Sequence, residues 1–323
     1  MASPSFSIIV PTYQRRDMVC EMVSALSELT YDGSLEIIVV VNGSTDGTAE
    51  AVDGLDCRWP MRVVEIQRNR GPAGARNRGA DEATGDILLF LDDDMICDPK
   101  LVQQHARMYR DGADAVAGNI PLHPRSPPGV LTDAVASAAV WDQRTELTPF
   151  EIYAGQLSVR KSVFDALGGF DEQFAAGGGF GNEDVEFGAR LLERFDVRHN
   201  PKAISHQVNL VSARQFMDRA SQLAVADIRL AAKHPELGRK LFFHRAAQRS
   251  RPQRLTYRFF SASPAVTALI ANGAVGLCEL ALRTRFRSNP LLARAFIDAC
   301  SIAYWSKIRR AAGPDLVREF LRL

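Results

Sequence analysis

The sequence predicts an α/β protein with a single mixed, mostly parallel sheet flanked by helices. Apolar runs of strand length, at residues 6–10, 35–41 and 87–91, alternate with segments whose apolar residues recur every three or four positions. A run that is apolar throughout is typical of a parallel strand covered on both faces. Strands and helices that alternate with short links require a parallel sheet with right-handed crossovers.

These patterns and the turn residues between them assign the elements in chain order. The first strand stops at Pro11, and the second ends in the turn-rich loop 42–48, where Asp46 or Thr48 can cap the next helix. The expected order is strand 6–10, helix 18–29, strand 35–41, helix from 49, strand 61–66, helix from 73, strand 87–91, a proline-rich loop within 112–150, helix 131–141, strand 152–159, helix from 183, strand 198–206 and helices from 212 onward.

Charge is unevenly distributed along the 323 residues, although the net charge is only +1. From Arg245 to the end there are 14 Lys and Arg against 4 Asp and Glu, a net of +10, which leaves −9 for residues 1–244. The basic tail predicts an anionic partner, either a membrane surface or nucleic acid, or else a solvated face that pairs with the acidic body. An apolar stripe at 292–303 can lie on a membrane or pack in a core, and packing is favoured.

The cysteines and the termini indicate the compartment. Five cysteines are widely spaced, odd in number and without a Cys-x-x-Cys pair, which argues against a disulfide framework and a structural zinc site. No charged and apolar leader is visible at the N-terminus. The most apolar window, Ser263–Leu282, contains Asn272 and Glu279 and predicts a buried or interfacial helix. We therefore expect a cytoplasmic protein.

Three consecutive carboxylates, Asp92, Asp93 and Asp94, come directly after the apolar run 87–91. In open α/β sheets, ligands bind at the carboxyl ends of the strands, where these acids should lie. Like charges this close repel unless a cation or several donors offset them. Oxygen ligands favour Mg²⁺ or Mn²⁺, often an ion that also touches phosphate. The alternative is an acidic surface turn.

Polar residues also follow the other strands, and four such loops should converge at one edge of the sheet. These loops together predict a nucleotide-diphosphate site. They supply a hydroxyl, an aromatic ring on which a base can stack, amide groups, and the N-terminus of a helix that can bind phosphate. Neither a Gly-x-Gly-x-x-Gly loop nor a Walker loop is present. Each loop taken alone is also explained as an ordinary turn. The candidate nucleotide-binding residues are Pro11, Thr12, Tyr13, Asn42, Ser44, Asp46, Arg76, Asn77, Asp92 and Asp93.

Four segments resemble the successive motifs of the family 2 glycosyltransferases, which have the GT-A fold. They are Pro11–Tyr13, Val40–Gly47, Asn69–Gly79 and Phe90–Asp94, and the likeness covers roughly residues 5–210. The resemblance implies that Asp92 faces the donor ribose and that Asp94 binds a metal, Mn²⁺ or Mg²⁺, in an Asp-x-Asp motif. The family usually has an acid at the position of Val41, so the base of the nucleotide stays open.

A second acidic pair, Glu183 and Asp184, opens a predicted helix after three glycines. The helix dipole favours acids in a first turn, which is one explanation of the pair. The pair also resembles the family's Glu-Asp motif, so Asp184 is the candidate general base and Glu183 its catalytic neighbour. His206 matches a histidine that often completes the family's metal shell, and it is otherwise a structural histidine. The candidate metal ligands are therefore Asp94, Asp92 and His206.

The resemblance implies a GT-A catalytic domain, 1–230, and an appended helical C-terminal region, 231–323. The catalytic domain would bind the nucleotide sugar through residues 1–125 and the acceptor through residues 126–230. The implied activity is inverting, metal-dependent and non-processive sugar transfer to a hydroxyl, because the Gln-x-x-Arg-Trp element of processive synthases is absent. The alternatives are a sugar-nucleotidyltransferase and a non-catalytic nucleotide-binding protein.

The expected partners follow from this activity and from the basic tail. They are a nucleotide-diphosphate sugar donor and an acceptor that is a glycan, a lipid-linked sugar or a small molecule. No nucleic-acid partner is expected. The basic C-terminal region is a candidate for peripheral contact with the inner face of the membrane, and a homo-oligomer is a further candidate assembly.

Overall fold

The computed structural model describes residues 3–129, 131–132, 147–175, 181–208, 211–247, 249–284 and 286–321. The helix expected at 131–141 lies almost entirely outside the described residues. The chain packs as two compact units. The first comprises Met1–Ser126, Ala139–Gly179 and Glu183–Asn209, and the second comprises Pro127–Ala138, Phe180–Asn182 and Leu210–Leu323. The functional boundary expected at residue 230 stays a prediction.

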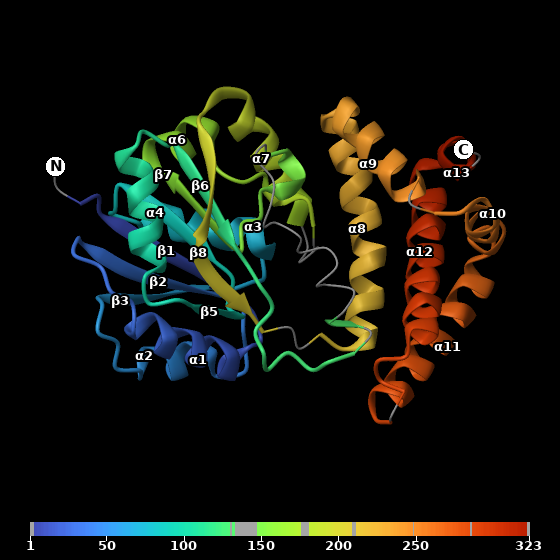
Figure 1. The fold of residues 1–323 in the computed structure, drawn as a ribbon, viewed down its shortest axis with the longest axis horizontal. Helices are drawn as coiled ribbons and strands as arrows, with labels where there is room; N and C mark the ends of the chain where they lie inside the picture. Colours follow the sequence, from blue (N-terminus) through green and yellow to red (C-terminus); the bar gives the residue numbers. More distant parts are fainter. Residues whose placement is uncertain are drawn as a thin grey trace. The chain divides into compact units, whose positions relative to one another are not determined.

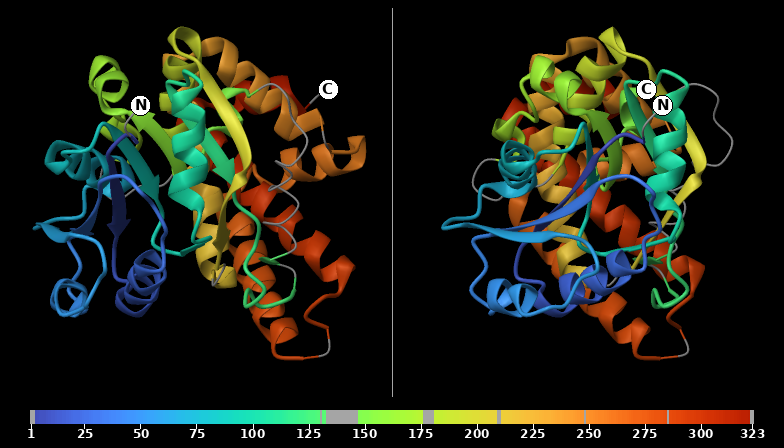
Figure 2. Two further views of the ribbon diagram at one scale, coloured as in Figure 1. Left: turned by 60° about the vertical axis from the view of Figure 1, so that its left-hand side comes forward. Right: turned by 90° about the vertical axis from the view of Figure 1, so that its left-hand side faces the viewer.

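The first unit contains an eight-stranded sheet with the order β3-β2-β1-β4-β7-β6-β8-β5 (Figure 1). Strands β3, β2, β1 and β4 are parallel to one another. Strand β7 is antiparallel to β4 and β6, whereas the long strand β8, yellow in Figure 2, runs parallel to β6 and antiparallel to β5. The predicted fold class is confirmed. The strands are β1 (Phe6–Thr12), β2 (Leu35–Asn42), β3 (Met61–Ile66), β4 (Ile87–Leu91), β5 (Met95–Cys97), β6 (Ala115–Asn119), β7 (Gln156–Arg160) and β8 (Val197–Gln207).

Helices cover both faces of this sheet, which explains why the central strand β4 is apolar at every position. Side chains alternate along β1, so Ile8 and Val10 pack in the cluster that contains α1 and α4 residues, and Ile9 packs in the cluster of α3 and α7. The helices of the first unit are α1 (Arg16–Ser27), α2 (Thr48–Asp53), α3 (Gly71–Glu82), α4 (Leu101–Arg110), α6 (Lys161–Leu167) and α7 (Glu183–Arg194), with 3₁₀ turns at Pro149–Glu151 and Glu172–Ala175.

Helix α3 lies unusually close to β1, and a glycine permits this approach. A Cβ atom added at Gly79 would lie 2.4 Å from Cγ2 of Ile9 and 3.1 Å from Cγ2 of Val40. Both neighbours are fully buried in the sheet. The close contact fixes the height of α3 above the sheet, and α3 carries two of the candidate site residues, Arg76 and Asn77.

We expect Gly79→Ala to destabilise the protein by about 1–3 kcal/mol, because overpacking a filled core forces side chains off their rotamers. Urea unfolding measures this change. Gly54→Ala is a matched control: Gly54 ends α2 with φ −80, and its added Cβ meets no atom closer than 3.4 Å. Equal stabilities of the two variants would show that α3 can move away from β1 at little cost.

Two strands were not expected from the sequence. β6 lies inside the stretch read as irregular, and β5 has only three residues. The residues of β6 are Ala115-Val-Ala-Gly-Asn119, which are small and have little intrinsic strand preference, yet the strand is paired on both sides by β7 and β8. Tertiary pairing therefore determines this strand. The strand expected at 152–159 begins later, as β7 at Gln156.

The second unit is a bundle of helices, as expected for the appended C-terminal region. The apolar stripe expected at 292–303 is core, because Phe296, Ala299 and Ile302 are buried in it. Figure 2 shows α11 and α12, in orange and red, running side by side. The helices are α8 (Ala213–Lys233), α9 (Pro235–Ala247), α10 (Arg251–Phe260), α11 (Pro264–Leu282), α12 (Pro290–Ala312) and α13 (Pro314–Leu321).

A buried carboxylate connects three segments of this bundle. Asp227 on α8 is fully buried. Its Oδ2 accepts hydrogen bonds from Nε of Arg245, at 2.8 Å, and from the hydroxyl of Tyr304, at 2.6 Å. Its Oδ1 accepts from the amide of Asn182, at 2.7 Å. Because a buried carboxylate is stable only when it is paired and hydrogen-bonded, this network holds α8, α9 and α12 in register.

Candidate active site

The site lies where parallel strands end at one edge of the sheet. β1 ends at Thr12, β2 at Asn42 and β4 at Leu91, directly before Asp92. The chain leaves β1 toward β2 on one side and returns to β4 on the other, so the strand order reverses between β1 and β4. Open α/β sheets bind ligands at such a point, because the loops on either side diverge and leave a crevice.

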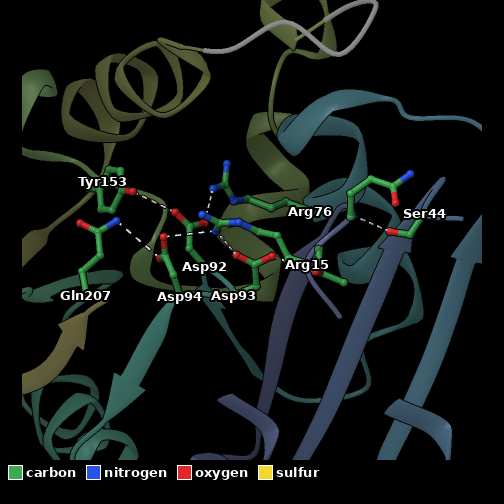
Figure 3. Close-up of polar contacts among 10 residues, drawn as sticks. Arg15, Ser44, Arg76, Asp92, Asp93, Asp94, Tyr153 and Gln207 are labelled. Atoms are coloured by element: carbon green, nitrogen blue, oxygen red, sulfur yellow. Dashed lines mark hydrogen bonds and ion pairs between the residues drawn. The ribbon is translucent and has the colours of Figure 1, made fainter. Parts of the chain in front are cut away.

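Arg76 of α3 joins the two acidic segments of the site, and Figure 3 shows its contact with Asp92. Its Nη2 donates to Oδ1 of Asp92 at 2.7 Å, and its Nη1 donates to Oε1 of Glu183 at 2.9 Å. The side chain is buried, and the guanidinium lies over the ring of Phe170, 5.6 Å from the centroid. Burial opposes the charge of Arg76, but the carboxylates of Asp92 and Glu183 outweigh it and raise the pKa of Arg76. Asp92 and Glu183, which are 91 positions apart in the sequence, are therefore tied by one buried cation.

The outer oxygen of Asp92 has its own donor. Tyr153 donates its hydroxyl to Oδ2 of Asp92 at 2.9 Å. Gly155 leaves room for this contact, since a Cβ there would lie 2.2 Å from the Tyr153 ring and 2.8 Å from Oδ2 of Asp92. Both oxygens of Asp92 are thus oriented by the protein.

Asp93 and Asp94 share a second arginine. Nη1 of Arg15, at the start of α1, lies 2.6 Å from Oδ1 of Asp93 and 3.3 Å from Oδ2 of Asp94. Thr12 donates its hydroxyl to Oδ2 of Asp93 at 2.8 Å, and the amide of Gln207 reaches Oδ1 of Asp94 at 3.5 Å (Figure 3). Asp93 and Asp94 are both buried. The turn after β4 is therefore held by the ends of β1 and β8.

The acids outnumber the arginines that contact them. Five carboxylates meet two guanidinium groups, so the site carries excess negative charge. Burial, together with the charge of Asp92, raises the pKa of Asp94 to about 6. Burial also raises the pKa of Asp93, against the influence of Arg15. A site of this kind favours an added cation. The five acids are Asp92, Asp93, Asp94, Glu183 and Asp184.

The second acidic pair opens helix α7. Asp184 has a pKa raised to about 7, first by burial and then by the charge of Glu183, while Arg76 lowers it. Its Oδ1 accepts a hydrogen bond from the backbone N–H of Val185 at 2.8 Å. Glu183 is buried, and its Oε2 has no hydrogen-bond partner among the described residues. A carboxylate that titrates near neutral pH is suited to accept a proton from a substrate hydroxyl.

The candidate nucleotide-binding side chains are mostly engaged with the protein itself. Asn42 donates to Asn69 and to the carbonyl of Gly71, and Asn77 donates to the carbonyl of Phe170. These contacts shape the loops around the site. Direct contact of Asn42, Asn77 or Arg76 with a nucleotide stays a prediction.

The loops after β1 and β2 are fastened to each other at the same edge. The backbone N–H of Gln14 donates to Oγ of Ser44 at 2.9 Å, and the N–H of Arg16 donates to Asp46 at 3.1 Å. Gln14 has a φ angle of 53°, in the left-handed region that residues other than glycine rarely adopt. The ring of Tyr13 is 46% exposed, so it remains open to stacking.

His206 is placed differently from the other candidate metal ligands. It pairs with Ile96 across β5 and β8, and its ring packs edge-on against that of His123, with centroids 6.1 Å apart. The next residue, Gln207, is the one that reaches Asp94. Among the described residues, no three His, Cys, Asp or Glu side chains are grouped to hold one ion. The assignment of His206 as a ligand stays a prediction.

The remaining acids nevertheless fit a divalent cation. Mg²⁺ and similar ions are commonly held by one or two carboxylates together with substrate phosphates, so a three-residue cage is not required. Asp92 and Asp94 provide two carboxylates. Burial and then the charge of Asp92 raise the pKa of Asp94, so an added cation would stabilise its ionised form. We therefore keep Asp92 and Asp94 as the residues that would hold the ion.

Three residues of the site were missed from the sequence: Arg15, Tyr153 and Gln207. Arg15 lies two residues beyond the Pro-Thr-Tyr segment in which β1 ends, and an arginine just beyond a strand end that faces three acids was a usable signal. Tyr153 and Gln207 reach the acids from 61 and 113 positions away in sequence. Nothing in their local sequence marks them.

The parallel strands β3, β2, β1 and β4 have helices on both faces, with one acidic cluster at the switch point and a second tied to it by a buried arginine. This arrangement is of the GT-A type that the sequence predicted. Residues 7–136 match the model of the family described as glycosyl transferase family 2. The resemblance seen in the sequence is therefore confirmed over these residues, which make up about 40% of the chain.

Individual relatives agree with this assignment. The chain is 27% identical over 276 residues to validoxylamine A glucosyltransferase of Streptomyces hygroscopicus subsp. limoneus. The alignment covers 74% of this chain and 59% of the relative. Other curated relatives are matched over as little as 28% of their length. The chain thus spans between about a quarter and three fifths of the curated relatives that it matches first.

Solved structures share the fold. A mannosyltransferase of Pyrobaculum calidifontis, in complex with GDP-Man and Mn²⁺, aligns with a TM-score of 0.56 at 21% identity, over 93% of this chain and 86% of that one. S. aureus TarS 1-349, in complex with UDP, aligns with a TM-score of 0.52 at 19% identity, over 96% and 92%. Both likenesses concern the fold.

Proposed function

We propose that this protein transfers one sugar from a nucleotide-diphosphate donor to an acceptor hydroxyl, with inversion at the anomeric carbon. The observation that carries the proposal is the buried bridge of Arg76 between Asp92 and Glu183. It brings the acids at the end of β4 together with those at the start of α7. Donor-binding and proton-accepting groups would then act on one substrate pair.

In the proposed reaction, Asp184 accepts the proton of the acceptor hydroxyl while the hydroxyl oxygen forms a bond to the anomeric carbon. The bond between that carbon and the diphosphate oxygen breaks, and the nucleoside diphosphate leaves. Arg76 holds Glu183 and Asp92 in place during this exchange. The unpartnered Oε2 of Glu183 offers an acceptor for a hydroxyl of a bound sugar.

A divalent cation, Mn²⁺ or Mg²⁺, held by Asp92 and Asp94, would supply Lewis-acid stabilisation of the leaving diphosphate. The fold neighbour from Pyrobaculum calidifontis was solved in complex with GDP-Man and Mn²⁺, which supports a divalent cation here. The fold neighbours bind guanosine and uridine diphosphate compounds, so the fold does not select a base. The valine at position 41 is buried in the sheet beside Thr12 and leaves the base open as well.

The stereochemistry of the product tests the proposal. The full chain is incubated with a panel of α-linked sugar nucleotides, Mn²⁺ and candidate acceptors, and the product is examined by NMR. We expect a single β-linked product, and loss of turnover with EDTA that Mn²⁺ restores. An α-linked product would contradict the direct displacement, and full activity in EDTA would contradict the role given to Asp92 and Asp94. Release of pyrophosphate in a parallel incubation with a nucleoside triphosphate and a sugar 1-phosphate would favour a nucleotidyltransferase.

The partners and the location follow as parts of the same proposal. The acceptor is a glycan, a lipid-linked sugar or a small molecule with a free hydroxyl, and each encounter adds one sugar. The five cysteines are free thiols among the described residues, which supports a reducing cytoplasm.

A further inference from the structure

Large exposed apolar side chains are concentrated on one part of the second unit. Nine such side chains are exposed among the described residues, and eight of them lie between residues 255 and 291. Single exposed apolar residues are normal, but a concentration of this size marks an interaction surface. We call the eight residues the apolar face; they are Leu255, Phe259, Val266, Leu269, Leu277, Leu280, Phe286 and Leu291.

Helix α11 is the centre of the apolar face. Val266, Leu269, Leu277 and Leu280 recur at intervals of three, eight and three residues, which places them on one side of the helix. On the other side, Thr267, Val275, Cys278 and Ala281 are buried. Val275 and Cys278 pack in one cluster with Phe296 and Cys300 of α12.

The outer side of α11 has open space around it. A Cβ atom added at Gly273 or at Gly276 would meet no atom within 4 Å. α11 is also the one helix of the described residues that is long and apolar enough to cross a membrane, by length and composition alone, and 28% of that window is buried. Figure 1 shows α10 and α11 on the outer side of α12 within this unit.

The apolar face is surrounded by positive charge. Between residues 251 and 294 the sequence has seven arginines and one acid, Glu279, so the segment carries a net charge of +6. Arg251, Arg283, Arg287 and Arg294 are exposed. An apolar helix side bordered by arginines is the pattern that lies in the interface of an anionic membrane.

We propose that the apolar face docks on the surface of an anionic lipid bilayer, with α11 lying along the interface and the arginines meeting lipid phosphates. A second copy of the chain fits less well, because a symmetric dimer through this face would bring two segments of +6 together. A membrane-spanning α11 fits less well too, because the buried side of the helix would have to leave α12. The proposal does not depend on sugar transfer.

Vesicle binding by the full chain tests the proposal without any sugar donor. The protein is sedimented with vesicles of phosphatidylglycerol and phosphatidylcholine, and in parallel with vesicles of phosphatidylcholine alone, at physiological salt. We expect strong binding to the anionic vesicles and weak binding to the neutral ones. Phe259→Ser with Leu269→Ser should lower the partition coefficient by about tenfold or more, since two large exposed side chains leave the interface.

Charge variants separate the two contributions. Arg283→Glu with Arg287→Glu should weaken binding to anionic vesicles by about tenfold or more, because each arginine near such a surface contributes about 1 kcal/mol. It should change binding to neutral vesicles little. Arg107→Glu reverses an exposed charge on α4 and is the matched control. This variant should bind vesicles as the unmodified protein does. Circular dichroism checks that each variant is folded.

Three outcomes would overturn the proposal. The first is that the unmodified protein ignores both kinds of vesicle. The second is that the unmodified protein does not bind vesicles but forms a dimer by light scattering, and that the Phe259→Ser, Leu269→Ser variant is a monomer. This result would assign the apolar face to a second copy of the chain. The third is that bound protein resists alkaline carbonate extraction, which places α11 across the bilayer.

Discussion

Asp184→Asn is expected to lower kcat by about 10²–10⁴-fold, the usual contribution of a general base, while the donor still binds. Asparagine keeps the shape of the side chain and removes the group that accepts the proton. Steady-state kinetics with a sugar nucleotide measures the loss, and calorimetric titration with the nucleoside diphosphate measures donor binding. Asp165→Asn, an acid on α6 whose side chain is 58% exposed, is a control with the same change of charge.

The pH dependence provides a second readout for Asp184. Because burial and Glu183 raise the pKa of Asp184 to about 7, kcat/KM of the unmodified enzyme should rise as the pH increases through about 7 and then level off. A variant that keeps the full rate and the same pH profile would reassign the base to another group.

The same raised pKa predicts an effect on stability. Between pH 3.8, the ordinary pKa of an aspartate, and about 7, the raised pKa of Asp184, the folded protein keeps a proton that the unfolded chain has lost. Stability therefore falls across this window as pH rises, and above it the ionised Asp184 destabilises the fold in full. Asp184→Asn should be more stable than the unmodified protein at pH 8, and the difference should vanish below pH 4. Such a gain in stability with loss of activity is typical of a functional residue.

Arg76→Met is expected to destabilise the protein by about 3–5 kcal/mol, because it leaves two carboxylates near each other without their buried cation. The effect should appear as a fall in the urea midpoint. Residual activity should also shift to higher pH, since Arg76 lowers the pKa of Asp184 and its removal raises that pKa. Arg76→Lys should rescue only part of both effects, because an ammonium group does not bridge two carboxylates as a guanidinium does.

Arg78→Met on the same helix is the matched control. Arg78 forms a partly exposed pair with Glu82 one turn away, and helix-surface pairs of this spacing contribute about 0.3–0.5 kcal/mol. If Arg76→Met and Arg78→Met unfolded at the same urea concentration, the bridge between Asp92 and Glu183 would not hold the site together.

Much of the fold follows from the sequence, for a physical reason. Strands β1, β2 and β4 are covered on both faces, so most positions in them are apolar and the pattern is clear. β6 is equally central, but its residues are small and do not show this pattern. β5 is fixed by three pairings with the end of β8, residues that are more than a hundred positions away.

The candidate site was predictable to a similar extent. Asp92, Asp93 and Asp94 stand out because charge rarely follows a buried strand so abruptly, and Glu183 with Asp184 open a helix. The bridging role of Arg76 was not predictable, since it depends on the packing of α3 against β1 through Gly79. For Arg15 the sequence shows only that it lies just beyond a strand end, and its position at the start of α1 decides which acids it meets.

Calorimetric titration of nucleoside diphosphates, with and without Mn²⁺, tests the central claim most directly. The claim is that the acids after β4 bind a metal together with the donor diphosphate. We expect one of the GDP, UDP and dTDP series to bind the unmodified protein tightly only with Mn²⁺, and Asp94→Ala to abolish this dependence. An unchanged Mn²⁺-dependent affinity in Asp94→Ala would contradict the claim.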